Sequence, residues 1–156
     1  GRVFYVADMH ASGVWEIDAT HFHVLKFLAT GAGTHGLYVS RNTRDLYITN
    51  RGEGSISVLN FATRRLVAKW RLPGGGSPDM GGVSADGKVL WLSGRYSGVV
   101  YAISTSDGTV AGGAGGASVA ACVGVGAGTG GPGGLTAAVC VGRATGSAGA
   151  LSLFGV

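Results

Sequence analysis

The chain has 156 residues and a formal net charge of +4, and this length is enough to bury one hydrophobic core. Its basic residues are scattered rather than gathered in a stripe, and this pattern argues against a nucleic-acid partner. Residues 111–142 carry no charged side chain, but they are too rich in glycine and too poor in large aliphatic residues for a membrane span, so we expect none.

Taken in chain order, alternating apolar and polar residues predict short strands separated by polar turns. Gly-rich loops are expected at 31–34 and 73–78, and an Asp-Gly pair at 86–87 suits a tight hairpin because glycine accepts positive φ. No apolar stripe of helical period is present. The predicted strands are residues 3–6, 14–18, 23–29, 36–40, 46–49, 55–60, 66–72, 81–84, 89–93 and 99–104.

One strand motif returns every 42 to 44 residues, as Tyr5-Val6-Ala7-Asp8, Tyr47-Ile48-Thr49-Asn50 and Trp91-Leu92-Ser93-Gly94. A second short strand follows each copy after a polar turn. A period of this length built from short strands is typical of β-propeller blades, whose four antiparallel strands run from the hub outward. We therefore predict an all-β fold, an incomplete β-propeller with one whole blade over 36–72 and parts of two others.

The composition changes sharply after residue 108, because 19 of the 20 charged side chains precede it. We predict two regions, a partial propeller over 1–108 and a Gly/Ala-rich, irregular tail over 109–156. An outer strand expected after Gly108 is missing from the pattern. The tail is open to three interpretations: a decayed fourth blade, a disordered segment, which we favour, or a stretch translated out of frame. Whether Cys122 and Cys140 pair stays open.

Four elements resemble the YVTN-type β-propeller repeat of bacterial and archaeal cell-surface and periplasmic proteins, and they recur in the order in which that repeat contains them. They are the turn Ser84-Ala85-Asp86-Gly87, the signature Tyr47-Ile48-Thr49-Asn50, the strand Ile56-Ser57-Val58-Leu59-Asn60 and the exit Leu72-Pro73-Gly74-Gly75. The resemblance covers residues 3 to about 108 and implies a propeller that closes with seven blades. It therefore implies that this chain is a fragment of a secreted, periplasmic or cell-envelope protein.

In a propeller, the loops entering the inner strands and the loops joining the second and third strands lie on one face, around the mouth of the channel. We predict a ligand- or partner-binding face there. Asp8 and Asn50 have an alternative role, in which their side chains stabilise turns through hydrogen bonds to the backbone. The predicted binding residues are His10, His35, Asn50, Arg51, Asp79, Arg95 and Tyr96, with Met9 and Met80 beside them.

No catalytic constellation stands out, because the two glutamates lie far apart in the repeat and no nucleophile elbow is present. His21 and His23, two residues apart, would share one face of a strand, with Asp18 or Glu16 as the nearest third metal ligand. A solvated strand edge is the simpler interpretation of this pair. We therefore predict no metal site and no cofactor.

These observations favour a non-enzymatic binding scaffold that holds an unknown protein or small ligand at the channel face. The alternative is part of a propeller enzyme, a lactonase-like hydrolase or a redox protein, whose catalytic residues lie on other blades. A third possibility is a truncated product without function, since unpaired strand edges promote aggregation.

Overall fold

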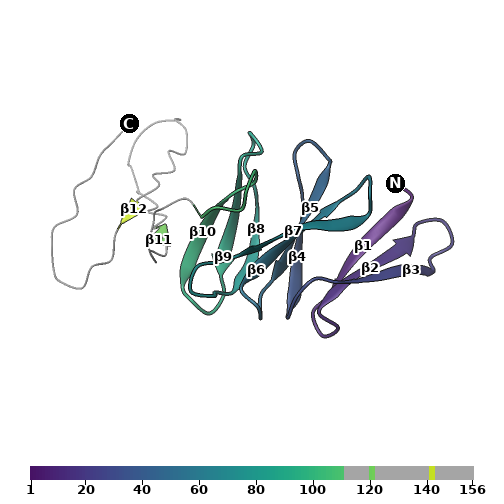
Figure 1. The fold of residues 1–156 in the computed structure, drawn as a ribbon, viewed down its shortest axis with the longest axis horizontal. Coiled ribbons are helices and arrows are strands. Elements are labelled where there is room, and N and C mark those ends of the chain that lie inside the picture. The colour runs from purple at the N-terminus through teal and green to yellow at the C-terminus, as the bar shows by residue number, and fades with distance from the viewer. Residues whose placement is uncertain (111–119, 122–140, 143–156) are drawn as a thin grey trace, which may run out of the picture.

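The computed structural model describes residues 1–110, 120–121 and 141–142, which form antiparallel sheets with no helix among them. Three sheets stand side by side in chain order (Figure 1). The first contains β1 (Val3–Asp8), β2 (Gly13–Asp18) and β3 (Val24–Ala29). The second contains β4 (Thr34–Val39), β5 (Asp45–Asn50), β6 (Ser55–Asn60) and β7 (Arg65–Arg71). The third contains β8 (Pro78–Val83), β9 (Val89–Gly94) and β10 (Val99–Ser104).

The predicted fold class, an all-β partial propeller, is confirmed. The motif strands β5 and β9 are each the second strand of their blade, and β1, which carries the same motif, is the first strand of its sheet. The first sheet therefore begins at the second strand of a blade. Two more short strands, β11 (Ala120–Ala121) and β12 (Val141–Gly142), pair with each other, and the other residues of the predicted tail after Val110 lie outside the described residues. Among the described residues, no helix is long and apolar enough to cross a membrane.

The third sheet shows the start of an outer strand that the sequence pattern did not predict. Val110 forms an antiparallel bridge with Ile103, at the position where Leu66 pairs with Leu59 in the second sheet. Val110 also packs against the core beneath it. The blade pattern therefore continues two residues past 108.

The hairpin turns repeat as faithfully as the strands do. Positions 42 and 44 residues apart take the same left-handed backbone conformation, even where the residue is not glycine. Glycine is the residue that adopts this conformation without steric cost. The three sets of equivalent positive-φ positions are Ser12, Gly54 and Gly98, then Phe22, Arg64 and Gly108, then Thr43 and Gly87.

Replacing Thr43 by glycine is expected to stabilise the protein. Thr43 has φ of 56°, and its repeat equivalent Gly87 has φ of 77°. Removing the steric cost of a left-handed non-glycine residue raises the free energy of unfolding by about 1–2 kcal/mol. The larger conformational entropy that glycine loses on folding offsets about half of this gain. Urea unfolding of Thr43→Gly measures the gain, and Gly87→Ala, the reverse change at the equivalent turn, is expected to destabilise. Equal stabilities for all three proteins would contradict this account.

The core lies between the sheets, because the second sheet buries both of its faces. Successive side chains of a strand point to opposite faces. Leu46 and Ile48 therefore pack with Val14 of the first sheet, while Tyr47 packs with Leu92 of the third sheet. Blades packed face to face in this way bury nearly every residue of β5 and β6, whereas β7 alternates exposed and half-buried residues.

The inner strands begin earlier than predicted. They start at Thr34 and Pro78 rather than at 36 and 81, and each contains an irregularity in pairing, between Thr34 and Leu37 and between Pro78 and Gly81. A β-bulge interrupts side-chain alternation and re-aims the residues within it. His35 and Asp79, which the sequence places in loops, therefore lie on bulged strands.

Candidate functional site

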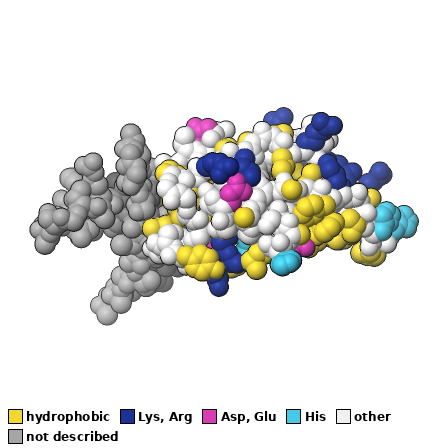
Figure 2. Space-filling view, turned by 60° about the horizontal axis from the view of Figure 1, so that its bottom comes forward, with side chains coloured by type: hydrophobic (Ala, Val, Ile, Leu, Met, Phe, Trp, Pro, Cys, Tyr) yellow, Lys and Arg dark blue, Asp and Glu magenta, His cyan; other side chains and the backbone are white. Residues whose placement is uncertain are grey.

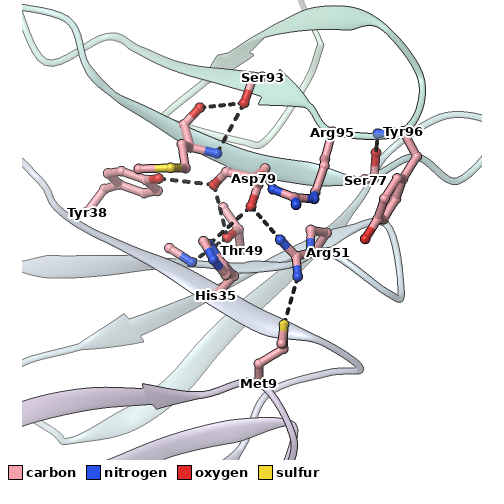
Figure 3. Close-up of polar contacts among 12 residues, drawn as sticks. Met9, His35, Tyr38, Thr49, Arg51, Ser77, Asp79, Ser93, Arg95 and Tyr96 are labelled. Carbon is pink, nitrogen blue, oxygen red and sulfur yellow. Dashed lines mark hydrogen bonds and ion pairs between the residues drawn. The ribbon is translucent and has the colours of Figure 1, made fainter.

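Two bulges and three turns converge at one end of the sheets (Figure 3). His35 and Asp79 occupy the same repeat position, 44 residues apart, in the bulges of neighbouring inner strands. Arg51 comes from the β5–β6 turn, and Arg95 and Tyr96 come from the β9–β10 turn. Because each blade contributes the same two elements, the repeat itself brings these side chains together.

Asp79 is the centre of this cluster and is 4% exposed. Its Oδ1 accepts a hydrogen bond from Arg51 Nη1 at 3.1 Å, and its Oδ2 accepts one from Arg95 Nη1 at 3.4 Å. His35 Nδ1 lies 3.1 Å from Asp79 Oδ1, a close approach without hydrogen-bond alignment. A buried carboxylate requires such partners, since an unpaired charge in the interior is costly.

The backbone of the Asp79 bulge is held on both sides. The Tyr38 hydroxyl donates to the Asp79 carbonyl at 3.0 Å, from the neighbouring sheet. On the other side, the Met80 N–H donates to Ser93 Oγ at 3.2 Å. Burial raises the pKa of Tyr38, so its hydroxyl keeps the proton it donates. These contacts fix the direction of the Asp79 side chain.

Tyr96 lies beside the two arginines and is 75% exposed. The Cζ atoms of Arg51 and Arg95 lie 6.0 and 5.8 Å from the centroid of its ring, within the range of cation–π attraction. The Tyr96 N–H donates to Ser77 Oγ at 2.8 Å, which fixes the turn. The hydrogen bond to Asp79 raises the pKa of Arg95, so its guanidinium stays charged.

The cluster has an excess of positive charge. Two guanidinium groups share the single carboxylate of Asp79, which leaves one positive charge uncompensated. Arg51 also donates to the thioether of Met9, in the β1–β2 turn. The side chain of Arg95 is 53% exposed, so the excess charge faces solvent. The arrangement suits an anionic group that approaches beside an aromatic ring.

Five of the seven predicted site residues meet in this cluster, and two do not. Asn50 is fully buried and points into the sheet. Its side-chain amide donates to Ser55 Oγ and Ser57 Oγ, each at 3.0 Å. His10 is exposed in the β1–β2 turn, and its ring makes no polar contact with the cluster among the described residues. The cluster residues are His35, Arg51, Asp79, Arg95 and Tyr96.

Asp8 has the turn-stabilising role that was its alternative. Its Oδ1 accepts from the backbone of His10 and Ala11, and its Oδ2 accepts from Trp15 Nε1 at 3.0 Å. The backbone hydrogen bond from Ala11, followed by the one from Trp15, lowers the pKa of Asp8. Sequence reasoning missed Tyr38 and Ser93 as supports of the cluster, because each reads as an ordinary strand residue and only the bulge pairing reveals its role.

The sequence pattern placed His21 and His23 on one face of a strand, and this was wrong, because both lie in the β2–β3 turn. The strand β3 begins only at Val24, one residue after the second histidine. Glu16, one of the two expected third ligands, is fully buried and binds Arg64, whereas Asp18 lies next to both histidines.

Comparisons with known proteins agree with this architecture. The chain has a TM-score of 0.62 to a hydrazine synthase of Kuenenia stuttgartiensis, at 19% identity, over 70% of this chain and 31% of that one. It has a TM-score of 0.58 to the dihydro-heme d1 dehydrogenase NirN, at 20% identity, over 70% of this chain and 23% of that one. For a virginiamycin B lyase of Staphylococcus aureus the TM-score is 0.59, at 14% identity, over 69% and 36% of the two chains.

The chain thus spans little more than a third, or less, of these structures, and at such low identity the likeness shows the fold alone. No curated protein matches the chain significantly. The sequence profile of a β-propeller family does match it, from residue 3 to residue 115, which includes all ten strands of the three sheets. The chain belongs to the YNCE-like β-propeller family.

Proposed function

We propose that this chain is part of a non-enzymatic binding propeller whose channel face holds an acidic segment of a partner protein. The observation that carries the proposal is the shared carboxylate of Asp79. Two arginines satisfy it, and the remaining positive charge lies against the exposed ring of Tyr96. Arginine binds carboxylates through paired N–H groups, so a glutamate or aspartate of a partner fits this charge.

The residue types around the cluster support a protein partner. Arginine and tyrosine are enriched among the few residues that supply most of the binding energy at protein interfaces. Met9 and Met80 are 50% and 64% exposed on the two sides of the cluster, and methionine adapts to varied surfaces. The cluster is also prearranged, because the Asp79 contacts hold Arg51 and Arg95 before any partner arrives.

Two further parts of the proposal come from the sequence. The propeller is of the YVTN type, which the motif Tyr47-Ile48-Thr49-Asn50 supports. Its place is the cell envelope or the secreted fraction, as in that family. Detection of the protein in the periplasmic or culture fraction of its host tests the location, and its retention in the cytoplasm would contradict it.

A propeller enzyme is the second candidate, and the approach of His35 to Asp79 favours it. An imidazole next to a carboxylate is an arrangement of general bases. Here, however, the Asp79 carboxylate also binds two arginines, so it is not dedicated to the His35 imidazole as the carboxylate of a general base would be. Lactone hydrolysis by the whole protein that disappears in His35→Gln would establish the enzyme instead.

Replacing Arg95 by glutamate is expected to weaken binding of a fluorescent polyglutamate peptide at least about tenfold, since reversal removes one favourable charge contact and adds a repulsive one. Fluorescence anisotropy at two salt concentrations measures this, and the salt dependence should fall with the affinity. The control is Arg44→Glu, an exposed arginine in the β4–β5 turn at the opposite end of the sheet. Equal losses in both variants would overturn the proposed function.

A further inference from the structure

The β2–β3 turn carries a cluster that lies apart from the channel-face site. His21 Nδ1 lies 2.7 Å from Asp18 Oδ2, and His23 Nδ1 lies 3.9 Å from the same oxygen. One ligand atom from each of the three residues falls within 4.8 Å of the others. The two imidazole rings stack at 6.0 Å between centroids. Figure 2 shows histidine side chains gathered at the end of the molecule away from the grey segment.

We propose that Asp18, His21 and His23 form a surface site for a divalent transition-metal ion such as Zn²⁺. Two imidazole nitrogens and a carboxylate oxygen are ligands that Zn²⁺ binds, with water completing the coordination. A tetrahedral ion with bonds of about 2.0–2.1 Å separates its ligand atoms by about 3.4 Å. The two observed distances lie on either side of that value, so small rotations of exposed side chains bring both to it.

Hydrogen bonds of the turn backbone hold the three residues in place, and they do not involve the histidine side chains. The Asp18 N–H donates to the His23 carbonyl, and the Phe22 N–H donates to the Asp18 carbonyl, each at 2.9 Å. Asp18 Oδ1 accepts from the Thr20 N–H at 2.9 Å, which leaves Oδ2 facing the two imidazoles.

The equivalent turn of the second sheet shows that this backbone does not require histidine. Asn60, Thr63 and Arg65 stand where Asp18, His21 and His23 stand in the first sheet, 42 residues earlier. The same backbone hydrogen bond closes it, from the Arg64 N–H to the Asn60 carbonyl at 2.8 Å.

The cluster of three ligands is a property of the first turn's sequence and not of the repeat. The hydrogen bond to Asp18 Oδ2 gives His21 a structural role, but it gives His23 none, whereas a metal site requires both histidines.

The experiment is titration of the full chain with Zn²⁺ by calorimetry, in a Cys122→Ser/Cys140→Ser background that removes thiol ligands. We expect one ion per chain. His21→Ala and His23→Ala are each expected to weaken binding at least about tenfold, as loss of a ligand should cost no less than loss of an outer-shell partner. Co²⁺ in place of Zn²⁺ reports the coordination number through its visible absorption, which these two variants should abolish.

Two further variants make the test decisive. Asp18→Asn preserves the turn, as Asn60 does in the second sheet, but removes the anionic ligand, so affinity should fall while the unfolding midpoint stays the same. His10→Ala removes an exposed histidine from the β1–β2 turn and should leave Zn²⁺ affinity unchanged. Absence of Zn²⁺ binding, or equal losses in His10→Ala and His23→Ala, would overturn the site.

Discussion

Replacing Arg64 by alanine is expected to lower the free energy of unfolding by about 3 kcal/mol or more, because it leaves a buried charge without its partner. Glu16 is fully buried on β2, and its Oε2 accepts a hydrogen bond from Arg64 Nη2, in the β6–β7 turn. The contact joins the first and second sheets. The other carboxylate oxygen, Glu16 Oε1, has no hydrogen-bond partner among the described residues. Urea unfolding of the full chain measures the loss.

The matched control removes both partners together. Val58 and Ala102 occupy the position of Glu16 in the other two sheets, so the repeat itself tolerates an apolar residue there. Glu16→Val/Arg64→Ala should therefore be more stable than Arg64→Ala alone, as buried ion pairs are often replaceable by apolar groups. A double variant no more stable than the single one would show that Arg64 acts through its turn conformation rather than through Glu16.

The Glu16–Arg64 contact also marks a limit of sequence reasoning. The strand periods and the 42-to-44-residue repeat were enough to predict the sheets, because alternation reports which side of a strand is buried. The equivalent residues of the other two sheets, Val58 and Ala102, are apolar, and nothing in the repeat explains why Glu16 is charged. Its partner lies 48 residues away in a turn, and no local pattern links the two. Only the packing of two neighbouring sheets brings them into contact.

The candidate site was predictable to the extent that it follows the repeat. Arg51 and Arg95 stand at equivalent turn positions 44 residues apart, and the blade topology places both on one face. Asn50 precedes Arg51 in the chain but points into the sheet, and the sequence contains no signal for that choice. The bulges at His35 and Asp79 were missed for a related reason, since a bulge breaks the alternation that strand prediction requires.

The second large effect is expected from Asp79→Asn, which removes the charge that Arg51 and Arg95 share. The Arg51 side chain is only 12% exposed, so its guanidinium would remain partly buried without a counter-ion. We expect a loss of about 3 kcal/mol in the free energy of unfolding, typical of a buried ion pair that loses one partner. The control Asp86→Asn changes an exposed turn carboxylate that accepts a hydrogen bond from Ser84 Oγ, and it should cost far less stability than Asp79→Asn.

The same substitution separates stability from binding. Without the carboxylate, the cluster carries two uncompensated positive charges instead of one, and one more charge contact at the surface is worth about 1 kcal/mol, or roughly fivefold in affinity. Asp79→Asn should therefore unfold more easily and yet bind polyglutamate more tightly. Fluorescence anisotropy of the labelled peptide, titrated with protein in the absence of urea, measures the affinity.

A second variant tests the cause of the stability loss. Met9 is the equivalent of Arg51 in the first sheet, so Asp79→Asn/Arg51→Met replaces the buried cation with a residue that the repeat already uses. This double variant should recover most of the lost stability and lose the gain in affinity. If Asp79→Asn instead weakened both properties, the prearrangement of the two arginines by Asp79 would matter more than the net charge of the cluster, and the charge account of binding would be wrong.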